Sequence, residues 1–157
     1  TLLRRNGFMD YCKEHGVEGK VHTIPYSVMN PSENKEHMGD FFVKNPAVNG
    51  VAVLGTRVHV IADLFNREKM RGIRLVGMDL TKGNIDAMRK GDINFLVGQR
   101  PEKQGFLAVE ALLHHMLYGK TTFKDNFQPL DIITLENLDY WDADRRADTL
   151  GLPLMPS

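Results

Sequence analysis

The stretch from Ile73 to Gly105 constrains the fold of this chain more than any other part of it. It contains two short apolar segments, one with Ile73, Leu75 and Val76 and one at residues 95–97, with a helical pattern between them. Each segment leads to a glycine and then to polar side chains. This order predicts parallel strands joined by a crossover helix. Ligands of open parallel sheets bind beyond the carboxyl ends of the strands, so these polar side chains are candidates for a binding site.

The rest of the chain continues the alternation of helices and strands. Helical spacing or capping signals predict helices at residues 2–15, 30–44, 58–71, 81–91 and 102–117. An apolar run predicts a further strand at residues 50–54, and residues 20–25 and 127–134 are further strand candidates. The fold class is therefore α/β, with a three-layer parallel sheet and helices on both faces. Residues 142–157 form a tail for which the sequence predicts no definite structure.

Three local patterns sharpen these expectations. Asn30, Pro31 and Glu33 are spaced as in a capping box, which predicts a helix start at Asn30. The continuous apolar run at residues 50–54 is typical of a strand that is covered on both faces. The longest predicted helix carries one apolar stripe at helical spacing, formed by Phe106, Val109, Leu113 and Leu117.

Charge and length exclude several classes of protein. The 157 residues have a formal net charge of zero and no basic block, so we do not expect this chain to bind DNA by itself. No apolar run approaches the roughly 20 residues of a membrane helix. The single cysteine, Cys12, cannot form an internal disulfide, which fits a reducing compartment. The chain opens on Thr1 inside a predicted helix, so we expect it to be a piece of a longer protein.

No enzymatic motif is present. The sequence lacks both nucleotide-binding glycine motifs, the G-x-S-x-G elbow and any C-x-x-C pair. His114 and His115 are adjacent on a predicted helix and point in different directions, so they form a poor metal chelate. We therefore expect no cofactor, no metal site and no catalytic activity.

Polar residues instead recur at consecutive strand ends: Thr56 and Arg57, then Asp79, then Gln99 and Arg100. A ligand rich in hydroxyl groups needs such a set, because carboxylates accept from hydroxyls and arginine donates a rigid fork of hydrogen bonds. For single residues a simpler role remains open, in which Asp79 caps the next helix and Arg100 makes a surface ion pair. The repetition at strand ends favours a ligand site.

Four segments together resemble a known family. They are RRNGFMDY, GVAVLGTRVHVIADLF, LVGMDLT and FLVGQRPEKQGFLAVEALLHHMLYGK. Over about residues 2–141 the chain resembles the effector-binding domain of the lactose-repressor (LacI/GalR) family. That domain shares the type I periplasmic-binding-protein-like fold, in which sugar binds between two α/β lobes joined by three crossing strands.

The resemblance implies a domain organisation. Residues 1–98 would be most of the C-terminal lobe, and residues 99–120 the hinge crossing and one helix of the N-terminal lobe. Residues 121–141 would return to the C-terminal lobe, and residues 142–157 would be the tail. Most of the N-terminal lobe and any helix-turn-helix domain would then lie outside this chain.

The resemblance also implies site residues. Arg4 matches the arginine that contacts effector hydroxyls from the start of a helix. Asp79 matches the acid after a glycine–aromatic pair, although Met78 replaces the aromatic residue here. Gln99 matches the glutamine at the crossover.

One site position departs from the family's pattern. Gly55 and Thr56 stand where the family commonly has asparagine and aspartate, which removes an amide and a carboxylate. Arg57 would take over part of that role. Tyr26 would stack on a sugar ring.

Two functions follow from the resemblance. The first is the effector-sensing domain of a cytoplasmic LacI-type transcription regulator, a homodimer that binds a carbohydrate and reaches DNA only through a helix-turn-helix outside this chain. The alternative is a periplasmic sugar-binding protein of a transport or chemotaxis system. The fold alone does not separate them.

Overall fold

The computed structural model describes residues 2–26, 29–119 and 127–141. The chain divides into two compact units, residues 1–96 and 97–157. Residues 121–126 and the expected tail at 142–157 lie outside the described residues. Within the described part of the chain, no helix is both long enough and apolar enough to cross a membrane.

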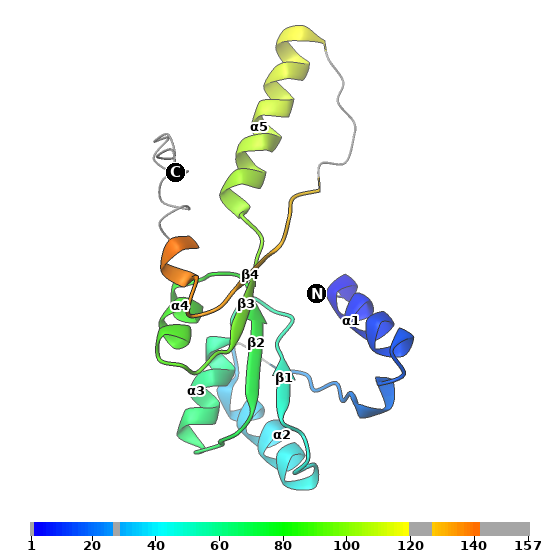
Figure 1. The fold of residues 1–157 in the computed structure, drawn as a ribbon, viewed down its shortest axis with the longest axis vertical. Coiled ribbons are helices and arrows are strands. Elements are labelled where there is room, and N and C mark those ends of the chain that lie inside the picture. The colour runs from blue at the N-terminus through cyan, green and yellow to red at the C-terminus, as the bar shows by residue number, and fades with distance from the viewer. Residues whose placement is uncertain (1, 27–28, 120–126, 142–157) are drawn as a thin grey trace. The chain divides into compact units, whose positions relative to one another are not determined.

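The elements follow the predicted alternation (Figure 1). The first unit contains α1 (Leu2–Glu14), a short 3-10 helix (Glu18–Lys20), α2 (Pro31–Lys44), β1 (Gly50–Ala52), α3 (His59–Arg67), β2 (Arg74–Met78) and α4 (Lys82–Arg89). The strand β3 (Phe95–Gly98) contains the boundary between the units. The second unit continues with α5 (Pro101–Tyr118) and β4 (Asp131–Ile133).

The sheet has the strand order β1-β2-β3-β4. β1 and β2 run parallel, with Val51 opposite Leu75, and Val53 continues the ladder by donating its N–H to the Val76 carbonyl at 2.9 Å. Both strands therefore end at the same edge of the sheet, which we call the carboxyl edge. In Figure 1, α3 and α4 lie on one side of these strands and α1 on the other. The α/β fold with helices on both sides of the sheet is confirmed.

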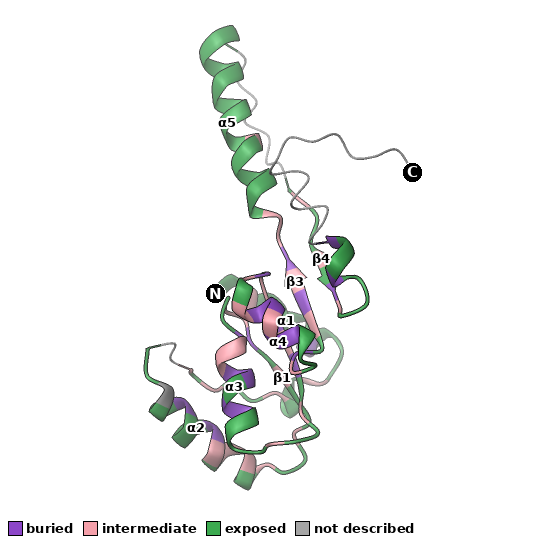
Figure 2. Ribbon diagram, turned by 90° about the vertical axis from the view of Figure 1, so that its left-hand side faces the viewer, coloured by how far each residue is buried: buried purple, intermediate pink, exposed green. Residues whose placement is uncertain are grey.

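The core of the first unit lies between β2 and the two amphipathic helices α3 and α4 (Figure 2). Ile61, Met88 and Leu75 are completely or almost completely buried, and each such side chain stabilises the fold by roughly 1.5–3 kcal/mol. A Cβ atom at Gly77 would approach the Val58 side chain more closely than 3.0 Å. The start of α3 therefore packs directly on the β2 backbone, which fixes the helix relative to the carboxyl edge.

Two expectations about the first unit were wrong, and a third was right only in part. Residues 20–25 form the end of the 3-10 helix and an irregular segment instead of a strand. β1 is not covered on both faces: Gly50 and Ala52 are exposed, and Val51 is partly buried. β1 also lies at the end of the strand order, next to β2. α2 begins where expected, with Asn30 at the N-cap position, but the Asn30 side chain does not cap the helix. Its amide donates to the Glu33 carboxylate at 2.7 Å instead.

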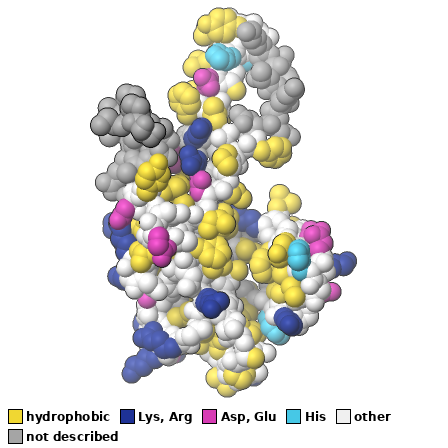
Figure 3. Space-filling model, viewed as in Figure 1, with side chains coloured by type: hydrophobic (Ala, Val, Ile, Leu, Met, Phe, Trp, Pro, Cys, Tyr) yellow, Lys and Arg dark blue, Asp and Glu magenta, His cyan; other side chains and the backbone are white. Residues whose placement is uncertain are grey.

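The apolar stripe of α5 is present but exposed. Phe106, Val109, Leu113 and Leu117 are 67%, 59%, 50% and 69% exposed, and none of the residues of α5 is buried. Figure 3 shows hydrophobic side chains along this helix. Within the described residues, α5 therefore contributes little to the hydrophobic core.

Candidate functional site

Arg4 of α1 reaches the carboxyl end of β1. Its Nη1 atom donates to the Leu54 carbonyl oxygen at 3.0 Å, two residues beyond the strand. A guanidinium group carries five N–H donors, so this bond leaves donors for a ligand. The backbone contact holds Arg4 at the position where ligands of parallel sheets bind.

Tyr26 and Arg57 lie at the same strand end. The Tyr26 hydroxyl lies against the Cα atom of Gly55, which directly follows Leu54. Burial raises the pKa of the Tyr26 phenol, and the positive charge of Arg57 acts in the opposite direction. The phenol is therefore protonated at neutral pH, and its hydroxyl can both donate and accept a hydrogen bond.

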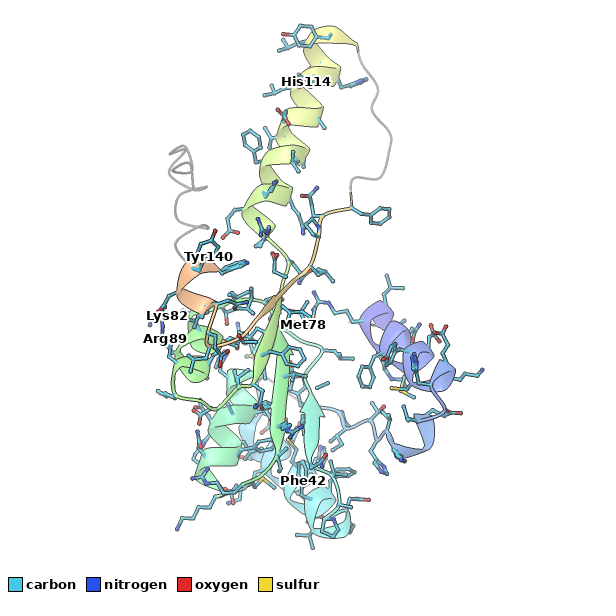
Figure 4. All side chains as sticks on the ribbon, in the orientation of Figure 1. Phe42, Met78, Lys82, Arg89, His114 and Tyr140 are labelled. Carbon is cyan, nitrogen blue, oxygen red and sulfur yellow. The ribbon has the colours of Figure 1, made fainter. Side chains whose placement is uncertain are left out.

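Asp79 follows the end of β2, where Met78 is labelled in Figure 4. Its φ of 67° lies in the left-handed region, which aspartate and asparagine tolerate better than most residues. Asp79 does not cap α4. The cap is Thr81, whose hydroxyl accepts from the Asn84 N–H at 3.4 Å, as expected from a helix start at residue 81.

The buried amide of Asn84 joins the two strand ends. Its Nδ2 atom donates to the carbonyls of Thr56 at 2.8 Å, Met78 at 3.1 Å and Asp79 at 2.8 Å. Its Oδ1 atom accepts from the backbone N–H of His59 at 3.1 Å and lies 2.8 Å from His59 Nδ1. One fully buried side chain thus fixes the segment after β1, the segment after β2 and the start of α3.

The carboxyl edge of the first unit therefore combines several kinds of polar group. Arg4 and Arg57 supply guanidinium donors, Tyr26 a protonated phenol, Thr56 a hydroxyl and Asp79 a carboxylate. This mixture suits a neutral ligand with many hydroxyl groups, each of which needs both donors and acceptors. The described residues contain no group of histidine, cysteine and acidic side chains that could hold a metal ion.

Gln99 and Arg100 belong to the second unit. The Gln99 carbonyl accepts from the Gln104 side chain, and Arg100 adopts the left-handed conformation before α5. Arg100 forms a bidentate ion pair with Asp131 of β4, with Nε and Nη2 donating at 2.6 and 3.2 Å. The Trp141 indole also donates to Asp131 at 3.3 Å. The hydrogen bond from Arg100, above all, lowers the pKa of Asp131.

The structure thus groups part of the predicted set. It brings Arg4, Tyr26 and Arg57 to the end of β1, and Asn84 ties the neighbouring Thr56 backbone to the backbone of Asp79. Gln99 and Arg100 lie in the other unit, where the Arg100 guanidinium is engaged by Asp131. Their roles in ligand binding stay predictions, as do those of the five residues of the first unit.

Asn84 was missed by the sequence analysis, and so was the ion-pair partner Asp131. A signal for Asn84 existed, because it lies four residues before Met88 and next to Ile85, on the apolar stripe of its helix. A polar residue on a buried stripe must have its hydrogen bonds satisfied within the fold. No comparable signal existed for Asp131, which lies 31 residues from Arg100.

Comparisons with known proteins agree with this architecture. Residues 1–121 match the profile of the periplasmic binding protein domain family. A putative LacI transcriptional regulator from Bacteroides fragilis is 30% identical over 68% of this chain and 37% of its own, with a TM-score of 0.64. None of the curated proteins compared matches the chain.

Two transport proteins show the same fold at lower identity. A periplasmic ribose ABC transporter protein from Conexibacter woesei is 19% identical, with a TM-score of 0.70 over 87% of this chain and 48% of its own. A carbohydrate transporter solute-binding protein from Agrobacterium radiobacter, in complex with D-arabinose, is also 19% identical, with a TM-score of 0.69 over 91% and 48%. The chain spans less than half the length of these three proteins. With its fold and 121 matched residues, it belongs to the periplasmic binding protein domain family.

Proposed function

We propose that this chain binds a carbohydrate at the carboxyl edge of its first unit. The convergence of Arg4, Tyr26 and Arg57 at the end of β1, with Asp79 at the end of β2, carries the proposal. Such an edge offers a carboxylate for paired hydroxyls, arginine forks for ring and hydroxyl oxygens, and an aromatic ring to stack on a sugar face. The solute-binding protein from Agrobacterium radiobacter, which holds D-arabinose on the same fold, supports it.

The experiment is a panel of pentoses, hexoses and uronic acids, titrated by calorimetry into the intact protein that contains this chain. The test variant is Asp79→Asn, because asparagine tolerates the left-handed backbone at this position. The substitution removes the negative charge and replaces one acceptor oxygen by an NH2 donor. The affinity for the best sugar should fall about 5- to 150-fold, the range for a buried polar group that loses its hydrogen-bond partner. The control is Asp63→Asn on the exposed surface of α3.

Two results would contradict the proposal. The first is that no sugar of the panel binds the folded protein. The second is that Asp79→Asn and Asp63→Asn leave the affinity equally unchanged, which would remove Asp79 from the site.

We further propose that the sugar is the effector of a LacI-type transcription regulator. The 30% identity to the putative regulator from Bacteroides fragilis supports this proposal. A regulator would work in the cytoplasm as a homodimer and would contact DNA through a helix-turn-helix outside these residues. Sugar binding would shift the dimer between states of different DNA affinity.

The alternative is a periplasmic solute-binding protein, which the longer structural match to the D-arabinose complex favours. Measuring the affinity of the intact protein for upstream DNA, with and without the best sugar, separates the two. A regulator should bind one DNA segment specifically and change its affinity when sugar is added. A transport protein should bind the sugar with no specific DNA binding.

A further inference from the structure

Gly55 and Tyr26 depend on each other sterically. A Cβ atom at position 55 would lie closer than 3.0 Å to the Tyr26 hydroxyl oxygen, a separation that real Cβ atoms essentially never show. The next atoms of the ring, Cζ and Cε1, would lie 3.3 and 3.6 Å away. One oxygen atom of Tyr26 therefore occupies the space that any side chain at position 55 would need.

The backbone does not require glycine here. Gly55 does not have a positive φ, unlike Gly16, Gly72 and Gly91. An L-residue could adopt the conformation of Gly55 if the Tyr26 hydroxyl were elsewhere. The contact with Tyr26 therefore explains why glycine occupies this position.

The contact lies where a ligand would meet β1. Leu54, the preceding residue, accepts a hydrogen bond from Arg4, and the charge of Arg57 acts on the Tyr26 phenol. Two cationic side chains and the phenol therefore surround the strand end. The phenol hydroxyl can donate to one ligand oxygen and accept from another, which an arginine cannot do.

We propose that Tyr26 and Gly55 form a pair that determines ligand specificity. Glycine at position 55 leaves the space in which the Tyr26 hydroxyl contacts a hydroxyl group of the bound carbohydrate. A side chain at position 55 displaces that hydroxyl and changes which carbohydrates are preferred. This inference rests on the proposed carbohydrate binding.

The test is a double-mutant cycle of Gly55→Ala and Tyr26→Phe in the intact protein. Tyr26→Phe removes the one clashing oxygen and keeps the ring, so the methyl group of alanine needs a shift of only a few tenths of an ångström. Each single variant should lower the affinity for the best sugar about threefold to tenfold, the range for losing one neutral hydrogen bond. The double variant should lose no more than either single variant.

Selectivity separates this role from a purely structural one. Binding is measured for the best sugar and for its deoxy analogues, each lacking one hydroxyl. One deoxy analogue should bind the wild type and Tyr26→Phe equally well, because the lost hydroxyl is the partner of Tyr26. Gly39→Ala is the control, since nothing lies within 4 Å of the added methyl group, and it should change neither affinity nor selectivity.

The outcomes distinguish this inference from the function on which it rests. If the wild type binds a sugar and the losses of the two single variants add in the double variant, the pair is not coupled and the inference is overturned. It is also overturned if Tyr26→Phe keeps the full preference for the best sugar over every deoxy analogue. If the folded wild type binds no sugar of the panel, the proposed carbohydrate binding fails, and the specificity role fails with it.

Discussion

Replacing Asn84 by leucine tests the idea that one buried amide holds the carboxyl edge together. Leucine has nearly the same size and shape but can neither donate nor accept a hydrogen bond. The Asn84 side chain is 0% exposed, so water cannot take its place without a change in structure. The substitution removes the contacts to the Thr56, Met78 and Asp79 carbonyls and to the backbone N–H and Nδ1 atoms of His59. The His59 ring is partly exposed, so its Nδ1 atom can bond to water instead.

The size of the effect follows from counting groups that lose their partner. The Nδ2 atom carries two protons, so it serves two of the three carbonyls at full strength at any moment. Thr56 is exposed, and we assume that its carbonyl turns to water after the substitution. The carbonyl of either Met78 or Asp79 and the backbone N–H of His59 then have no hydrogen-bond partner. Each costs about 1–3 kcal/mol, which predicts that the free energy of unfolding falls by about 2–6 kcal/mol. That is a large share of the roughly 5–15 kcal/mol that stabilise a typical domain.

Urea denaturation of the purified protein, followed by far-UV circular dichroism, measures this loss as a lower midpoint at an unchanged slope. The control is Asn66→Leu on the exposed surface of α3, where the asparagine accepts from Arg71 and the change should stay within about 0.5 kcal/mol. A loss below about 1 kcal/mol for Asn84→Leu would refute the reasoning.

Asn84→Asp adds an independent check on the donor role. It keeps an acceptor for the His59 N–H but directs a carboxylate oxygen at backbone carbonyls. The penalty should be large at neutral pH and should shrink toward pH ~4, where the carboxyl takes up a proton and can donate. A penalty that does not change with pH would mean that the three carbonyls do not need a donor.

Three further substitutions test other parts of the fold. Asp131→Asn should lower stability by about 1.5–3 kcal/mol at pH 7, because Arg100 lowers the folded-state pKa of Asp131. This advantage of the wild type is present above pH ~4 and is lost as the pH falls through the depressed folded-state pKa, so unfolding at pH 7 and at pH 3 measures it. Gly77→Ala should cost about 1–3 kcal/mol through its clash with Val58, whereas Gly39→Ala in α2 should stabilise by up to about 1 kcal/mol. Equal thermal midpoints for the two glycine variants would contradict the packing of α3 on β2.

The order of helices and strands was predictable because it rests on local patterns. Apolar residues at helical spacing located α3 and α4, and the apolar runs located β1, β2 and β3. The predicted strand at residues 20–25 failed for a physical reason. A β-strand is stabilised by pairing with a neighbour, and the described structure gives this segment no ladder partner.

The candidate site was predictable where it depends on strand ends and not where it depends on contacts between distant segments. The places of Arg57 and Asp79 could be predicted because Arg57 lies in the segment after β1 and Asp79 comes after β2. The contact of Tyr26 with Gly55 joins an irregular segment to a strand end 29 residues later, and no periodicity encodes it. The exposure of the apolar stripe of α5 could not be predicted either, because a helix that packs against a core has the same pattern.

The two strand ends share one support but place their polar side chains differently, and this difference bears on function. The Asn84 amide donates to the Met78 and Asp79 carbonyls at the end of β2 and to the Thr56 carbonyl after β1, so the fold itself sets the place of the Asp79 backbone. At the end of β1, the Tyr26 hydroxyl can keep its position only because Gly55 has no side chain. Changes at Gly55 can therefore alter the ligand contacts of β1 while leaving Asp79 in place. Under the proposed function, the β2 end would serve as the constant part of the sugar site and the β1 end as the part that selects among sugars.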